Sequence, residues 1–241
     1  MPTETRPTRI GMIVPSSNTC LEPQSYRILG AREDVTLHFT RIPVTRIALD
    51  SSSDKQFDSD VMREAAELLA TADVDVIAWN GTSGSWLGPG HDRKLAAEIS
   101  AATGIPATTS TLAYLAAFGA LGTERIGLFT PYTPDVNRAI AEAYGHCGIK
   151  VIGDVALGLS DNESFARATD GEMRPGSLEL AGLRPDALVY LCTNLYGSRI
   201  TAEIEEHTGV PVLDSVAVTL WHSLKLAGAP LLDPEWGRLL A

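Results

Sequence analysis

The sequence lacks the short motifs that bind nucleotide cofactors or mark common hydrolases. It contains no G-x-G-x-x-G, no G-x-x-x-x-G-K-[ST] and no G-x-S-x-G pattern. Its five histidines, His38, His91, His146, His207 and His222, form no i, i+4 pair and show no carboxylate spacing typical of a metal site. We therefore expect no nucleotide cofactor and no metal.

Basic residues and long apolar runs are also scarce. Nineteen Lys and Arg face thirty Asp and Glu, which gives a formal net charge of −11. Surfaces that bind phosphates need the opposite sign, so we expect neither nucleic acid nor an acidic membrane surface as a partner. The longest nearly apolar stretch, around 112–121, is too short to span a bilayer and is interrupted by Gly119. The first residues lack the apolar segment of a signal peptide, so we expect a cytoplasmic protein.

Cysteine is rare, and the three present are an odd number: Cys20, Cys147 and Cys192. This favours a reducing compartment over a disulfide framework. Cys20 and Cys147 lie in or beside expected helices, and we interpret both as structural. Cys192 follows an expected strand. Although most cysteines are buried core thiols, that position favours a reactive one.

The sequence does contain an internal repeat. Residues 9–15 (RIGMIVP) are echoed by 125–131 (RIGLFTP), and DVDVIAWNGTS at 73–83 by RPDALVYLCTN at 184–194. TGIP at 103–106 and TGVP at 208–211 each precede an apolar helix pattern that starts at a serine, Ser110 or Ser215. The repeat predicts two similar halves, 1–122 and 123–241, with a C-terminal tail that can pack back on the first half.

Each half alternates between strand and helix patterns, which predicts an α/β fold. The two pseudo-symmetric halves are each expected to be a parallel sheet flanked by helices, with an active site in the cleft between them. The polar stretch 48–58 is interpreted as a surface connection or a lid, and 161–176 gives mixed signals. Strands are predicted at 10–14, 35–44, 74–79, 126–130, 150–157 and 187–191, and helices at 60–70, 94–102, 135–144 and 201–206.

Polar clusters follow four of these strands, at 15–19, 80–85, 131–133 and 192–194. Ligands of open α/β sheets bind beyond the carboxyl ends of the strands, so the four clusters are expected to converge on one cleft. Helices begin after each cluster, and their free N–H groups favour a small anion such as a carboxylate. Each cluster taken alone is also typical of helix caps and turns.

Several of these segments resemble the aspartate/glutamate racemase superfamily, and within it the maleate isomerase and arylmalonate decarboxylase branch. The segments are IGMIVPSSNT, NGTSGS, TGIPATTSTLAYLAAFGALG, RIGLFTPYTPDVN and LCTNL. Racemases and maleate isomerases of this kind have one cysteine in each half. Here the second-half position is Cys192 and the first-half position is Gly81. Loss of one thiol disfavours two-base racemisation and makes the chain similar to the decarboxylases.

The resemblance implies a decarboxylation that passes through an enediolate without a cofactor. Thr82, Ser83, Tyr132 and the backbone N–H groups near Cys192 and Thr193 would stabilise the two oxyanions. Cys192 would deliver the proton to one face. The expected substrate is a small carboxylate or dicarboxylate, and a homo-oligomer is left open. The remaining residues expected to bind substrate are Ser16, Asn18, Asn80, Gly81, Thr193 and Asn194, with Ile42 and Val44 as an apolar wall.

Two alternatives remain open. The Ser16–Thr19 and Cys192–Asn194 segments look more like the isomerases, so a maleate-type cis–trans isomerase with Cys192 as its sole nucleophile is the second hypothesis. A non-catalytic carboxylate binder is the third. A roomy apolar cavity at Cys192 would favour the lyase, and a tight one lined by Asn18, Asn194 and an arginine the isomerase. Arg41 and Arg46 are themselves expected to be solvated.

Overall fold

The computed structural model describes residues 6–47, 59–232 and 234–240. The polar stretch 48–58, expected as a connection or lid, lies outside the described residues. The chain forms two four-stranded sheets in which every neighbouring pair is parallel. In sheet order, the first is β2 (Val35–Ile42), β1 (Thr8–Pro15), β3 (Val76–Trp79) and β4 (Ala107–Thr109), and the second is β6 (Lys150–Ala156), β5 (Arg125–Thr130), β7 (Ala187–Tyr190) and β8 (Val212–Asp214).

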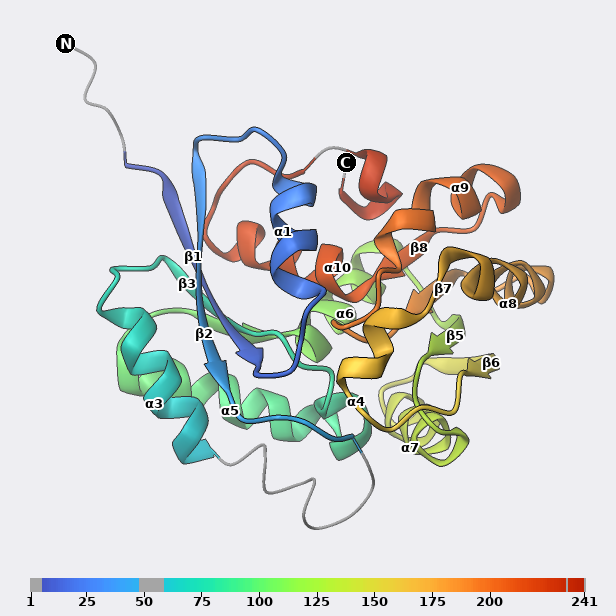
Figure 1. The fold of residues 1–241 in the computed structure, drawn as a ribbon, viewed down its shortest axis with the longest axis horizontal. Helices are drawn as coiled ribbons and strands as arrows, with labels where there is room; N and C mark the ends of the chain where they lie inside the picture. The colour runs from blue at the N-terminus through green and yellow to red at the C-terminus, as the bar shows by residue number, and fades with distance from the viewer. Residues whose placement is uncertain (1–5, 48–58, 233, 241) are drawn as a thin grey trace.

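Helices connect the strands in both halves (Figure 1). Two of them, α6 and α10, pack against each other in the centre of the molecule, and α10 also contacts β3 and β4 of the other half. Their contact includes a hydrogen bond of 2.8 Å from Thr219 Oγ1 to Ser110 Oγ. The helices are α1 (Leu21–Leu29), α3 (Ser59–Ala70), α4 (Gly84–Leu87), α5 (Pro89–Thr103), α6 (Ser110–Leu121), α7 (Pro134–Gly145), α8 (Asp170–Gly182), α9 (Ser198–Thr208) and α10 (Ser215–Leu226), with short 3-10 turns at Glu163–Arg167, Pro234–Trp236 and Arg238–Leu240.

The two sheets have the same strand order, which confirms the predicted fold class. Strand register shows which residues are equivalent. Trp79 at the end of β3 is level with Ile13 and Thr109, and Tyr190 at the end of β7 is level with Phe129 and Asp214. Both strands are buried throughout because helices cover both faces of a parallel sheet. Two residues beyond these ends, Gly81 and Cys192 therefore occupy equivalent positions.

The stretch with mixed signals, 161–176, contains the start of helix α8. A capping box begins this helix: Thr169 accepts from the Glu172 N–H, and the Glu172 side chain accepts from the Thr169 N–H. Pro175 lies inside the helix. Gly176 faces the sheet, where a Cβ would lie 3.0 Å from Phe129 Cε2, so glycine allows close packing.

The tail contacts both halves. Arg32 of the first half donates hydrogen bonds to the carbonyls of Pro230 and Leu231, and the Arg27 guanidinium lies 5.6 Å from the ring centroid of Trp236. Arg238 N–H donates to the Glu205 carboxylate on α9. The division at residue 122 stays a prediction.

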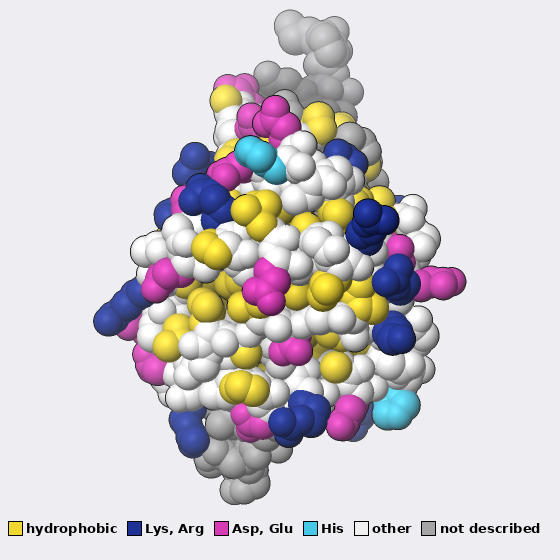
Figure 2. Space-filling view, turned by 90° about the vertical axis from the view of Figure 1, so that its right-hand side faces the viewer, with side chains coloured by type: hydrophobic (Ala, Val, Ile, Leu, Met, Phe, Trp, Pro, Cys, Tyr) yellow, Lys and Arg dark blue, Asp and Glu magenta, His cyan; other side chains and the backbone are white. Residues whose placement is uncertain are grey.

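Charges of both signs are interspersed with apolar side chains on the face shown in Figure 2. That face shows no single basic field of the kind that tracks phosphates. Among the described residues, no helix is long and apolar enough to cross a membrane.

Candidate active site

A small cavity lies where the carboxyl ends of the two sheets meet. Its volume is about 20 Å³, which is room for about one water molecule. Most of its wall is apolar, with hydroxyl groups and one thiol among the exceptions. The lining residues are Pro15, Val44, Ile47, Trp79, Gly81, Thr82, Ser83, Trp86, Tyr132, Asn162, Cys192 and Thr193.

Cys192 follows β7 and is only 2 % exposed. Its sulfur accepts a hydrogen bond of 3.3 Å from the Asn194 N–H and another from the Tyr132 hydroxyl. Burial raises the pKa of the Cys192 thiol to about 12, although the Tyr132 and Asn194 donors act in the opposite direction. The thiol is therefore protonated at neutral pH.

Tyr132 connects the thiol to the first half. Its hydroxyl lies 2.8 Å from Thr82 Oγ1, and its ring packs edge-on against Trp86 and Phe165, with centroids 5.5 and 5.3 Å away. Burial raises the pKa of Tyr132 well above its usual value, so the phenol stays neutral. A neutral phenol can donate a hydrogen bond to a developing oxyanion.

Ser83 supplies a second hydroxyl. The residue is buried, and its Oγ has no hydrogen-bond partner among the described residues. Buried hydroxyls in folded proteins are normally paired, so this unpaired one is unusual, and its contact with a ligand stays a prediction. Thr82, Ser83, Tyr132 and Cys192, the four expected catalytic residues, thus all line one cavity.

The backbone N–H groups near Cys192 and Thr193 are expected to stabilise an oxyanion, and this role stays a prediction. The N–H of Cys192 itself donates to Ser215 Oγ at 2.9 Å. Ser215 itself donates to the carbonyl of Tyr190 and lies 2.8 Å from the Tyr114 hydroxyl. This network holds the Cys192 peptide in place, so the Cys192 N–H is hydrogen-bonded within the protein.

The amide side chains near the cavity hydrogen-bond the opposite half. Asn18 Nδ2 donates to Thr193 Oγ1 (3.2 Å), and Thr193 Oγ1 donates to the Asn80 carbonyl (3.0 Å). Asn194 Oδ1 accepts from the N–H groups of Thr19 and Cys20. Among the expected substrate-binding residues, Gly81, Thr193 and Val44 line the cavity. The others are not among the lining residues: Ser16, Asn18, Asn80, Asn194 and Ile42. The substrate-binding role of all eight residues stays a prediction.

Both arginines lie outside the cavity wall. The Arg41 guanidinium pairs with Glu22 at 2.8 Å and donates to the Ser16 carbonyl, and Arg46 is exposed. The cavity is therefore tight, as expected for the isomerase, yet mostly apolar and without an arginine, as expected for the lyase. Neither expectation is met in full.

The sequence did not single out two of the lining residues, Ile47 and Asn162. Asn162 belongs to the stretch with mixed signals and donates to Ser17 Oγ at 2.8 Å. Ile47 directly precedes the polar stretch 48–58. No strand or helix periodicity in this part of the sequence indicates which way the Ile47 side chain faces. Trp79 and Trp86 both lie in the cavity wall.

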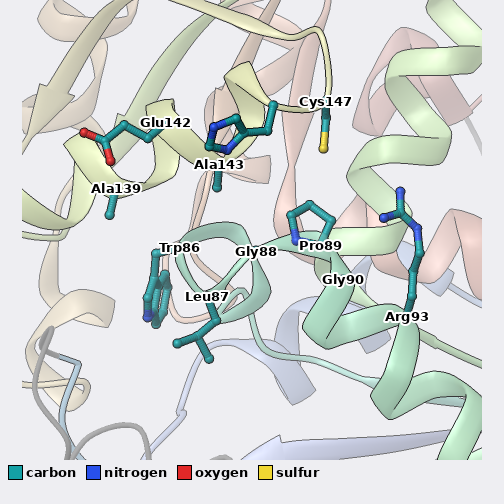
Figure 3. Close-up of a pocket in the computed structure, with 11 residues that line it drawn as sticks. Trp86, Leu87, Gly88, Pro89, Gly90, Arg93, Ala139, Glu142, Ala143 and Cys147 are labelled. Atoms are coloured by element: carbon teal, nitrogen blue, oxygen red, sulfur yellow. The ribbon is translucent and has the colours of Figure 1, made fainter.

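A larger surface groove of about 470 Å³ lies between α4, the start of α5, and α7 (Figure 3). It shares only Trp86 with the residues that line the Cys192 cavity. Cys147 lines this groove and is exposed, with Arg93 near it. In the part of the chain that the structure describes, no three His, Cys, Asp or Glu side chains gather as a metal site would require.

The sequence model of the arylmalonate decarboxylase family matches residues 10–240. The chain belongs to this family. An arylmalonate decarboxylase from Bordetella bronchiseptica is 29 % identical over 95 % of both chains, and a maleate isomerase from Geobacillus stearothermophilus is 27 % identical over 97 % of both.

Solved structures agree with this family assignment. A maleate isomerase from Pseudomonas putida S16 superimposes with a TM-score of 0.84 at 27 % identity, covering 97 % of this chain and 98 % of that one. A liganded arylmalonate decarboxylase mutant gives 0.85 at 26 % identity with the same coverage. The resemblance to the maleate isomerase and arylmalonate decarboxylase branch is confirmed. This family member is an enzyme of a branch that contains both lyases and isomerases.

Proposed function

We propose that this protein decarboxylates a malonate-type small diacid through an enediolate, with Cys192 as the proton donor. One observation carries the proposal. The buried, protonated thiol of Cys192 is hydrogen-bonded to Tyr132 and lines the cavity, and the equivalent residue of the other half is Gly81. One proton donor is sufficient for a decarboxylase, whereas a two-base racemase needs two.

In this reaction the hydroxyls of Thr82, Ser83 and Tyr132, which line the cavity, bind the carboxylate that remains. When the bond to the leaving carboxylate breaks, its electron pair moves into the remaining carboxyl group, which becomes an enediolate with two oxyanions. Each preorganised donor can lower the barrier by roughly 3–4 kcal/mol. The leaving carboxylate departs as CO₂ from an apolar environment, which Val44 and Ile47 provide.

Protonation completes the reaction. The Cys192 Sγ–H bond breaks and its proton forms the new C–H bond at the α-carbon of the enediolate. The resulting thiolate keeps its hydrogen bond from the Asn194 N–H, while the single Tyr132 O–H donates to the oxyanion. It then takes a proton from solvent, which restores the enzyme.

Substrate entry requires the wall to move, because about 20 Å³ does not hold a diacid. Trp86 is half-buried and lines both the cavity and the larger groove, so we propose that a change in its rotamer opens the cavity towards the groove. Its edge contact with Tyr132 gives it one preferred position in the closed state.

The test is CO₂ release from phenylmalonate-type acids without added metal. Cys192→Ala should abolish turnover, while Cys20→Ala, which also removes a buried thiol, should leave the reaction in place because Cys20 is not among the lining residues. Turnover that survives Cys192→Ala would remove Cys192 as the proton donor.

A second candidate is a maleate-type cis–trans isomerase that uses Cys192 as its sole nucleophile. It is supported by the similarity to maleate isomerases, which extends over 97 % of this chain. Incubation with maleate should then yield fumarate and a mass increase on Cys192. If neither acid reacts but both raise the melting temperature, the protein is a carboxylate binder.

A further inference from the structure

Trp79 and Gly81 fit together as one unit in the cavity wall. A Cβ built on Gly81 would lie 2.1 Å from Cζ2 and 2.3 Å from Cε2 of the Trp79 indole. Real Cβ atoms do not approach other atoms so closely. The indole is buried, with 1 % of the residue exposed, and it lines the same cavity as Cys192. The space that a side chain at position 81 would enter is therefore occupied by an aromatic ring.

The equivalent pair in the second half is arranged differently. Tyr190 occupies the register position of Trp79, but its hydroxyl donates to Ser177 Oγ on α8 at 2.8 Å and its ring packs against Phe129. Tyr190 does not line the cavity, and Cys192 does. In the first half, the aromatic ring of Trp79 lies in the cavity wall and position 81 is a glycine. In the second half, the ring of Tyr190 lies outside the wall and the equivalent position is Cys192.

We propose that Trp79 is a specificity-determining residue that keeps any acid–base side chain out of position 81. Gly81 alone does not restrict proton transfer to one face of the substrate, because a glycine with free space around it could be replaced by a residue with an acidic or basic side chain. The indole removes that room and presents ring carbons and its Nε1, none of them an acid or a base, where the other half presents a thiol. The stereochemical part of this inference rests on the proposed function of Cys192, and the steric part does not.

The close contact between Trp79 and Gly81 predicts that the fold does not accommodate the single substitution Gly81→Cys without a loss of stability. In Gly81→Cys the new side chain must displace a buried ring from a packed wall, which destabilises the fold. Trp79→Leu shortens the competing side chain and gives the new thiol a place. The product's α-proton can then leave to the introduced thiolate on one face while Cys192 protonates the other face. Both groups exchange protons with solvent, so the balance needs no further reactant.

The experiment compares the wild type, Trp79→Leu, Gly81→Cys and the double variant. The substrate is a 2-aryl-2-methylmalonate, and the readouts are the melting temperature and the enantiomer ratio of the 2-arylpropionate. We expect Gly81→Cys to melt below the wild type and the double variant to melt above Gly81→Cys. We expect both enantiomers, and solvent deuterium exchange into either one, only from the double variant.

Trp86→Leu combined with Gly81→Cys is the matched control. Trp86 is a second tryptophan in the same wall, but none of its atoms is among the three nearest to a Cβ at Gly81. This combination should melt no higher than Gly81→Cys. Equal rescue by Trp86→Leu would overturn the proposal, because any added space would then suffice. So would a Gly81→Cys variant that melts like the wild type and gives both enantiomers.

The steric readout separates this inference from the proposed function. If the wild type releases no CO₂ but the melting temperatures still show rescue specific to Trp79→Leu, decarboxylation is wrong and the role of Trp79 stands. If the wild type is active and no specific rescue occurs, the role of Trp79 is wrong and decarboxylation stands. A Gly81→Cys variant that fails to fold, with a double variant that folds, supports the inference.

Discussion

Tyr132→Phe removes one oxygen atom from the cavity and leaves the ring. That oxygen hydrogen-bonds both Thr82 Oγ1 and the Cys192 sulfur, and in the proposed reaction its single O–H turns from the sulfur to the oxyanion. Losing one preorganised donor costs roughly 100- to 1,000-fold in kcat, or about 3–4 kcal/mol of barrier. The ring contacts with Trp86 and Phe165 remain, so the fold should lose only about 2 kcal/mol, the typical worth of two hydrogen bonds.

The assay is steady-state CO₂ release, with a thermal melt of the same preparation. The Tyr132 bond lowers the pKa of Cys192, so its loss makes the thiol a weaker acid without changing its protonated state at neutral pH. The rate should therefore fall at every pH between 6 and 9 by a similar factor, a range chosen because it lies about 3 units or more below the Cys192 pKa of about 12. A decrease below about tenfold, worth about 1.4 kcal/mol, would refute the role of Tyr132 in stabilising the oxyanion.

Three further predictions follow from buried groups. Ser83→Ala should lower kcat by roughly 100-fold while the melting temperature stays near the wild type, because the hydroxyl has no partner among the described residues; an unchanged kcat would contradict its contact with substrate. Burial raises the pKa of Asp214 from 3.8 to about 7, so the folded state binds this proton more tightly than the unfolded chain. Stability should fall by up to roughly 4 kcal/mol as pH rises from about 4 to 7. In urea unfolding, Asp214→Asn, which keeps the oxygen that caps α10, should remove that slope, and an unchanged slope would count against it. Because the Cys192 pKa is near 12, iodoacetamide should modify exposed Cys147 well before Cys192, as mass spectrometry of the digested protein would show.

The repeat was sufficient to predict the fold because both halves reuse the same strand landmarks. The helices that start at Ser110 and Ser215 and the buried runs near Ile10 and Ile126 are confirmed. β4 and β8 were not predicted, since three residues are too few to show a period. Helix α8 was obscured by Gly171, Pro175 and Gly176, although Thr169 and Glu172 have the spacing of a capping box.

The candidate site was predictable in part. The position of Cys192, Thr82 and Tyr132 after strands of different halves was enough to expect them in one cleft. The same reasoning could not separate side chains that face a ligand from those that face the other half, as Asn18 and Asn194 do. Nor could it show that an indole fills the space beside Gly81, since that depends on how the Trp79 side chain packs.

The hydrogen bonds that shape the cavity are also the bonds between the halves. Thr193 Oγ1 accepts from Asn18 and donates to the Asn80 carbonyl, and Thr82 meets Tyr132 across the same boundary. Neither half can therefore assemble a partial site when it is produced as a separate fragment. A chain cut near Thr123, between α6 and β5, should regain turnover only when the two fragments reassociate, at a rate that rises with their concentration.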